Sequence, residues 1–193
     1  MLKKSLTLAA LAASLSFATG WEYANPSYGG NAQIRTGIDI NHEDEAAVAY
    51  TKARVVIKEN VELMASVTDN QVDWVSARVD ILDHGAVGVE LHNDYAIVAL
   101  QGYGNITDNV AVGGEANYNT DTKEVGVALE GDSFLFGHVQ YVGATYNTDK
   151  TFSPYVGYAL PVGPVDLGLC YYSVIWDGDY ITSGYSIDVT VKF

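Results

Sequence analysis

Charged side chains recur at every second residue in several segments of the first half of the chain. Lys52 and Arg54 form one such pair, and Arg78 and Asp80 form another. In an extended chain, residues two apart share one face, and a face that carries both signs of charge can orient hydrated ions and polar solutes. The four histidines have no metal-ligand spacing, and no nucleophile motif or phosphate loop occurs. We therefore expect no enzymatic activity, no metal and no cofactor.

The segments that carry these charges have the period of β-strands. The last ten residues show it most clearly, because every odd position from 185 is apolar and every even position is polar. Upstream segments of similar length are separated by short Asn, Asp and Gly clusters, which favour tight turns. This pattern predicts strands over 32–41, 49–58, 61–68, 73–82, 86–92, 95–103, 110–119, 123–131, 134–146, 152–160, 165–175 and 184–193.

Residues 1–20 have the features of a Sec signal peptide. Lys3 and Lys4 precede an apolar stretch from Leu6 to Ala18, which is too short to span a bilayer as a helix. Small residues at Ala18 and Gly20 suit a cleavage site. We expect cleavage after Gly20, with cleavage after Ala18 as the alternative, and a single domain over residues 21–193.

The composition narrows the class of protein further. The 193 residues include 24 Asp and Glu against 10 Lys and Arg, a net charge of -14. This charge argues against nucleic acid as a partner, because phosphate binding needs a basic surface. An apolar fraction of 48% argues against disorder. Cys170 is the single cysteine, so no intramolecular disulfide can form.

The last strand ends on an aromatic residue in phase with its apolar face. The residues that share this phase are Tyr185, Ile187, Val189, Val191 and Phe193. The pattern resembles the carboxyl-terminal signature of bacterial outer-membrane β-barrels, which the assembly machinery of that family recognises as a membrane-insertion signal. Segments 102–114 and 161–168 also resemble periplasmic hairpins of the family.

The resemblance implies an all-β fold, a transmembrane antiparallel up-and-down barrel in the outer membrane of a Gram-negative bacterium. Its partners would be outer-membrane lipid, lipopolysaccharide and the barrel-assembly machinery. A membrane strand needs about 9–11 residues, which allows 8 to 12 strands in this chain. We expect twelve with short turns, because alternation covers nearly the whole chain. An even number places both termini, and the turns at Asn109 and Pro161, on the periplasmic side.

If the apolar face meets lipid, the opposite face lines the interior. The side chains expected to line the lumen are Arg35, Asp39, Lys52, Arg54, Lys58, Glu62, Arg78, Asp80, Glu90, Glu115, Glu124 and Asp188, with Asn117, Glu130, Gln140, Asp166 and Lys192 on the same parity. Glu90 and His92 share this face as well, which favours lumen lining over acid–base chemistry. Tyrosines near strand ends suit either interfacial girdles or packing; they are Tyr50, Tyr103, Tyr118, Tyr141, Tyr158, Tyr171 and Tyr185.

These observations predict a porin-like channel for passive diffusion of small hydrophilic solutes or ions, with selectivity set by lumen charges. The main alternative is a non-conducting barrel with an adhesive or structural role, in which the inner charges pair with one another and the outer loops bind a partner. Short loops count against that alternative. A soluble periplasmic β-barrel or sandwich that binds a small ligand is a third possibility.

Overall fold

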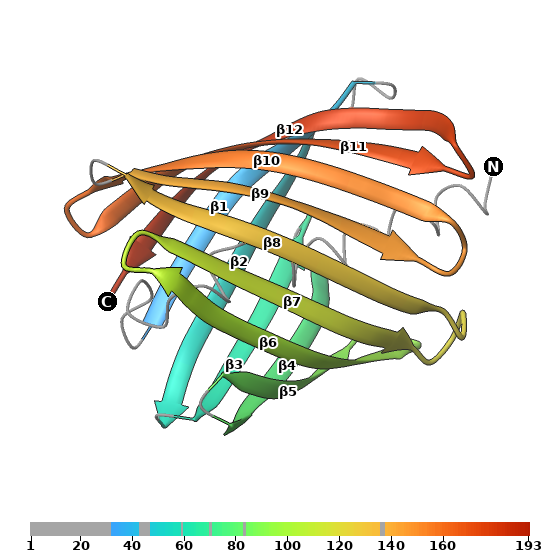
Figure 1. The fold of residues 1–193 in the computed structure, drawn as a ribbon, viewed down its shortest axis with the longest axis horizontal. Helices are drawn as coiled ribbons and strands as arrows, with labels where there is room; N and C mark the ends of the chain where they lie inside the picture. The colour runs from blue at the N-terminus through green and yellow to red at the C-terminus, as the bar shows by residue number, and fades with distance from the viewer. Residues whose placement is uncertain (1–31, 43–46, 59, 70, 83, 136–137) are drawn as a thin grey trace.

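Twelve antiparallel strands close into one barrel (Figure 1). The computed structural model describes residues 32–42, 47–58, 60–69, 71–82, 84–135 and 138–193; the proposed signal peptide lies outside them, as do the side chains of residues 58, 134 and 135. The strands are β1 (Ala32–Asn41), β2 (Ala47–Lys58), β3 (Val61–Thr68), β4 (Gln71–Leu82), β5 (Gly85–Leu91), β6 (Ala96–Thr107), β7 (Val110–Asn119), β8 (Val125–Leu135), β9 (His138–Asn147), β10 (Thr151–Val162), β11 (Val165–Trp176) and β12 (Asp179–Lys192).

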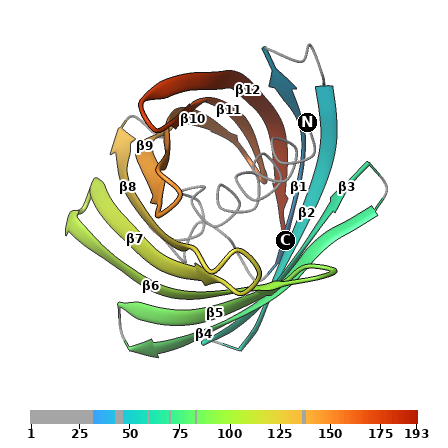
Figure 2. The ribbon, with the colours of Figure 1, turned by 90° about the vertical axis from the view of Figure 1, so that its right-hand side faces the viewer.

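The barrel is closed by pairing between its first and last strands. β1 pairs with β2 on one side and with β12 on the other, in a register that runs from Gln33 opposite Lys192 to Asn41 opposite Gly184. Every other strand pairs with its neighbours in sequence. Closure leaves no unpaired sheet edge, and the ring of strands is visible in Figure 2. The expected architecture, an up-and-down antiparallel barrel of twelve strands, is confirmed.

The connections differ in length between the two ends of the barrel. At the end where β1 begins and β12 ends, each of the five connections has two residues, whereas those at the opposite end have two to five. We call this opposite end the mouth. At the mouth, Asp177 (φ 50°) and Gly178 (φ 91°) form a two-residue hairpin turn with left-handed backbone at both positions, as a type I′ turn requires. The turns at Asn109 and Pro161 lie at the end where β1 begins and β12 ends.

The strand boundaries differ from the predicted ones in a few places. The strand expected over 134–146 is wrong at its start, since β8 continues to Leu135 and β9 begins only at His138. In the sequence, the two residues between these strands are Phe and Gly, so the Asn and Asp residues that precede or form most other turns do not mark this boundary. β6 and β12 are also longer than expected.

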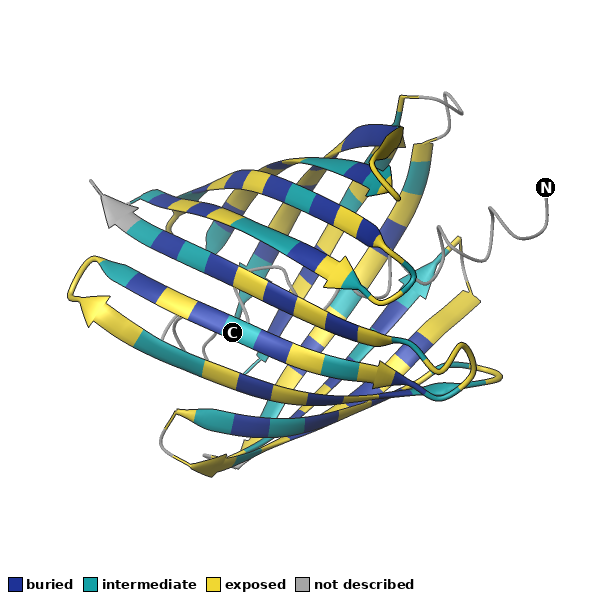
Figure 3. Ribbon diagram, turned by 45° about the vertical axis from the view of Figure 1, so that its right-hand side comes forward, coloured by how far each residue is buried: buried dark blue, intermediate teal, exposed yellow. Residues whose placement is uncertain are grey.

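Buried and exposed residues alternate along the strands of the barrel wall (Figure 3). Large apolar side chains point outward, and Leu129 on β8 is 72% exposed while Leu100 on β6 is 60% exposed. Their neighbours in sequence, such as Ala128, Glu130 and Gln101, are buried. The pleat of a β-strand gives this period of two. The described part of the chain holds no helix with the length and hydropathy needed to cross a membrane.

The tyrosines divide between the two faces. Tyr118, Tyr158, Tyr171 and Tyr185 are exposed on the outer face. The girdle interpretation is wrong for Tyr50 and Tyr141, which are 8% and 1% exposed and lie inside the barrel. Tyr103 is half-buried, with the guanidinium of Arg78 5.5 Å from its ring centroid. Aromatic residues on inward positions therefore pack within the barrel, as the alternative interpretation held.

Candidate channel interior

The first and last strands bring an arginine and an aspartate together on the inner face. Arg35 on β1 donates from Nη2 to Oδ2 of Asp188 on β12 at 2.6 Å. Both residues are buried. The carboxylate of Asp188 lies so close to Gly168 on β11 that a side chain there would collide with it. A glycine on the neighbouring strand thus makes the space in which this ion pair forms.

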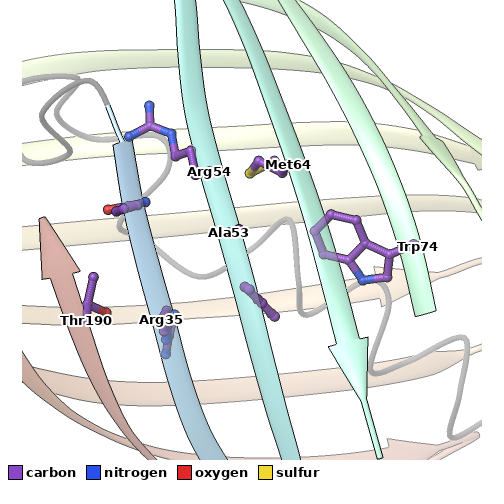
Figure 4. Close-up of a pocket in the computed structure, with 8 residues that line it drawn as sticks. Arg35, Ala53, Arg54, Met64, Trp74 and Thr190 are labelled. Atoms are coloured by element: carbon purple, nitrogen blue, oxygen red, sulfur yellow. The ribbon is translucent and has the colours of Figure 1, made fainter. Parts of the chain in front are cut away.

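Two further arginines are also held by carboxylates. Arg54 on β2 donates from Nε to Oε2 of Glu62 on β3 at 2.6 Å. Arg78 on β4 contacts Asp80, two residues along the same face, at 3.1 Å. Figure 4 shows Arg35 and Arg54 on neighbouring strands around one small cavity, which Met64, Trp74 and Thr190 also line. The positive side of the interior is therefore a set of ion pairs.

Two lysines on the inner face of the described strands also lie near carboxylates. Lys192 near the end of β12 forms an ion pair with Asp166 on β11. The ammonium of Lys52 lies 5.5 Å from the ring centroid of Tyr50, and its charge acts on both Asp39 and Glu90.

A group of carboxylates lies on the wall formed by β5, β7 and β8. Glu90, fully buried, is 2.5 Å from Nε2 of His92, whose ring stacks on Tyr95 with centroids 4.2 Å apart. Glu115 on β7 accepts hydrogen bonds from Nε2 of Gln101 at 3.0 Å and Nδ2 of Asn117 at 2.7 Å.

The next strand adds two more acids to this wall. Glu130 on β8 accepts a hydrogen bond from the hydroxyl of Tyr155 at 2.7 Å. Asp132, two residues further on the same face, is 2% exposed, and neither carboxylate oxygen has a hydrogen-bond partner among the described residues. Sequence reasoning missed Asp132, because the strand was expected to end at residue 131. The Glu130–Asp132 spacing of two is the signal that would have found it.

An aromatic cluster covers the inner wall next to these acids. Tyr141 on β9 and Tyr155 on β10 pack with Cys170 on β11, and all three are buried. The ring of Tyr141 occupies the position where a side chain at Gly157 would lie, and the ring of Tyr155 does the same at Gly143. The two rings therefore lie flat against the wall over glycines of the adjacent strands.

Three of the predicted lumen residues do not lie on the described inner wall. Gln140 is exposed on the outer face, so its assignment to the lumen is wrong; Val139 and Tyr141 point inward instead. Glu124 lies in the mouth loop before β8, where partial burial raises the pKa of its carboxyl and Thr122 donates to it at 3.0 Å. The side chain of Lys58 lies outside the described residues.

The carboxyl-terminal residues keep their expected phase in the structure. Tyr185, Ile187, Val189 and Phe193 are exposed, while Ser186, Asp188 and Thr190 between them are buried. Val191 is half-buried. This places an apolar stripe on the outside of the last strand, while its role as an insertion signal stays a prediction. Among the described residues no group of His, Cys, Asp and Glu side chains is arranged to hold a metal ion.

Comparison with known proteins gives matches at the level of structure. No family model matches the chain, and no curated protein is similar to it in sequence. A solved structure described as the KdgM porin superposes with a TM-score of 0.68 at 13% identity, covering 83% of this chain and 99% of its own. The NanC porin gives a TM-score of 0.57 at 10% identity, covering 84% of this chain and 100% of its own.

The outer-membrane protein Omp33 of Acinetobacter baumannii also gives a TM-score of 0.57, at 12% identity, with coverage of 86% of this chain and 99% of its own. All three matches extend over nearly the whole of the compared barrels. At these identities the likeness concerns the fold. The chain therefore has the fold of the small porin-like outer-membrane β-barrels.

Proposed function

We propose that this protein is an outer-membrane channel through which small hydrophilic solutes or ions diffuse passively. The observation that carries the proposal is the sorting of side chains in a closed barrel, with apolar residues outside and charged residues inside. An apolar outer band suits the hydrocarbon of a bilayer, and a charged interior suits water and ions. The structural likeness to the KdgM and NanC porins supports the same role.

The proposal includes an orientation and a set of partners. In bacterial barrels the short turns are periplasmic and the longer loops extracellular, so the mouth would face outward and both termini the periplasm. Lipid and lipopolysaccharide would surround the outer face, and the barrel-assembly machinery would engage the last strand after removal of residues 1–20. No step of the proposal needs a catalytic group or a cofactor.

The loops give little support to the adhesive alternative. The mouth connections have only two to five residues, which leaves a small surface for binding a partner. Diffusion through the interior does not depend on loop length. We therefore propose that the protein is a channel. A non-conducting barrel is the alternative outcome of the experiment that tests this proposal.

The direct test is a recording of single-channel current. The mature protein, refolded in detergent, would be added to planar bilayers, with heat-unfolded protein and detergent alone as controls. We expect discrete current steps from the folded form only. A protein that inserts into vesicles and shifts mobility on heating, as folded barrels do, yet gives no current would overturn the channel.

A further inference from the structure

We infer that the channel selects cations over anions, through an acidic stripe formed by Glu115 on β7 and by Glu130 and Asp132 on β8. This inference rests on the proposed function, because it names the charge of the solute that the same interior passes. Three observations support it. They are the excess of carboxylates inside the barrel, the spacing of the three acids along the wall, and the lack of a hydrogen-bond partner for Asp132.

The balance of charge on the inner face is negative. The described strands place nine carboxylates and five Lys or Arg side chains there. Four of the five cations touch a carboxylate directly, and the fifth, Lys52, acts on Asp39 and Glu90. An ion pair presents a much weaker field to a passing ion than a single charge does. The field in the interior is therefore set mainly by the surplus of acid.

The register of β7 and β8 brings the stripe together. Glu115 stands opposite Ala128, so Glu130 is its diagonal neighbour on the inner face, and Asp132 follows two residues later. Diagonal neighbours in antiparallel sheets lie about 7–8 Å apart. At that spacing, carboxylates can act in succession on one hydrated cation as it moves along the wall.

The environment of Asp132 supports cation binding independently of the charge count. It is 2% exposed and faces the interior, and both of its oxygens lack a hydrogen-bond partner among the described residues. Of the two described residues opposite it, Ala111 offers no polar side chain, while Tyr141 belongs to the aromatic cluster. Burial of a carboxylate without a partner is costly, so its charged form needs a cation or water from the lumen, and both oxygens are available to accept them.

The mouth of the barrel would concentrate the same ions. Exposed aspartates in its turns include Asp69, Asp94 and Asp121, while Asp177 forms an ion pair with Lys150. Partial burial and the negative charge of Glu90 and Asp73 raise the pKa of Tyr95, in the loop between β5 and β6, to about 12. Negative charge at this end of the channel would raise the local concentration of cations and lower that of anions.

The test is the reversal potential of single channels in a KCl gradient. The wild-type protein should show a K⁺ to Cl⁻ permeability ratio above one, and the ratio should fall as salt screens the wall. The triple variant E115Q/E130Q/D132N should lower the ratio by about threefold, and D132N alone should give part of that change. These amides keep the shape of the acids and can still accept the hydrogen bonds from Gln101 and Tyr155.

Asp108→Asn is the matched control, because Asp108 is exposed in the turn at the end opposite the mouth, outside the barrel wall. Like D132N, it removes one negative charge, and it should leave the ratio unchanged. Channels that conduct but prefer Cl⁻, or whose ratio is the same in wild type and triple variant, would overturn the acidic stripe while leaving the channel intact. Absence of current from a folded wild-type barrel would instead overturn the proposed function itself.

Discussion

Arg35 and Asp188 lie 153 positions apart in the sequence and meet at 2.6 Å across the pairing of β1 with β12. Their ion pair joins the two strands that close the barrel. A charged hydrogen bond of this kind contributes about 1.5–3 kcal/mol to stability.

We expect Arg35→Gln and Asp188→Asn each to destabilise the barrel, and the double variant to lose less than the sum of the two. The reason is that each single variant leaves one charge facing an uncharged partner. Urea unfolding in lipid vesicles, followed by tryptophan fluorescence, would measure how far each of the three variants differs from the wild type in its free energy of unfolding. Strictly additive losses would show that the two residues do not interact.

Gly157 should not tolerate a side chain. A methyl group at this position would occupy the space of the Tyr141 ring, so Gly157→Ala should lower stability by about 1–3 kcal/mol through overpacking. The temperature at which the folded form loses its altered gel mobility would report the change.

Gly131→Ala is the comparison for that experiment, because no heavy atom lies within 4 Å of the added carbon there. It should leave the transition close to that of the wild type. Equal transitions for the two variants would contradict the close contact between Gly157 and Tyr141.

Leu129 offers a test of the membrane-facing surface. It lies in the middle of β8 and is 72% exposed, so Leu129→Lys should destabilise the barrel in a bilayer by about 2–4 kcal/mol if that band meets hydrocarbon. Asp121→Lys, in a mouth loop, should have little effect. If Leu129→Lys lost as little stability as Asp121→Lys, burial of this face in lipid would be contradicted.

Phe193 should govern the rate of assembly in cells. Phe193→Ala removes the aromatic residue that ends the outward stripe of β12, and we expect slower appearance of the heat-modifiable form, measured by pulse-chase labelling. The purified variant should refold in detergent like the wild type, since the exposed ring makes few contacts within the barrel. Unchanged kinetics in cells would contradict its role as an insertion signal.

The strands could be predicted because their apolar residues alternate. In 185–193 every side chain lies on the face that its polarity indicates. The rule fails in β9, where Val139 and Tyr141 point inward and Gln140 points outward. The aromatic cluster explains this difference, because part of the interior is itself apolar and polarity no longer identifies the inner face.

The partners of the charged side chains could not be predicted. Periodicity assigns Arg35, Arg54 and Arg78 to the interior, but only the register of the strands shows that each one meets a carboxylate. The sequence places charges of both signs on the inner face but does not show which of them pair. Pairing neutralises much of the positive side, so the field across the interior is less symmetric than the sequence indicates.

The pairing of β1 with β12 also constrains how the barrel assembles. The outer edge of β1 has no partner until β12 arrives, so an incomplete chain keeps two open edges that can pair with other chains. Within hydrocarbon such edges are costly, because their amide and carbonyl groups find no water. Insertion and ring closure must therefore be coupled late events, and a chain in transit depends on being kept from aggregation until its last hairpin is available.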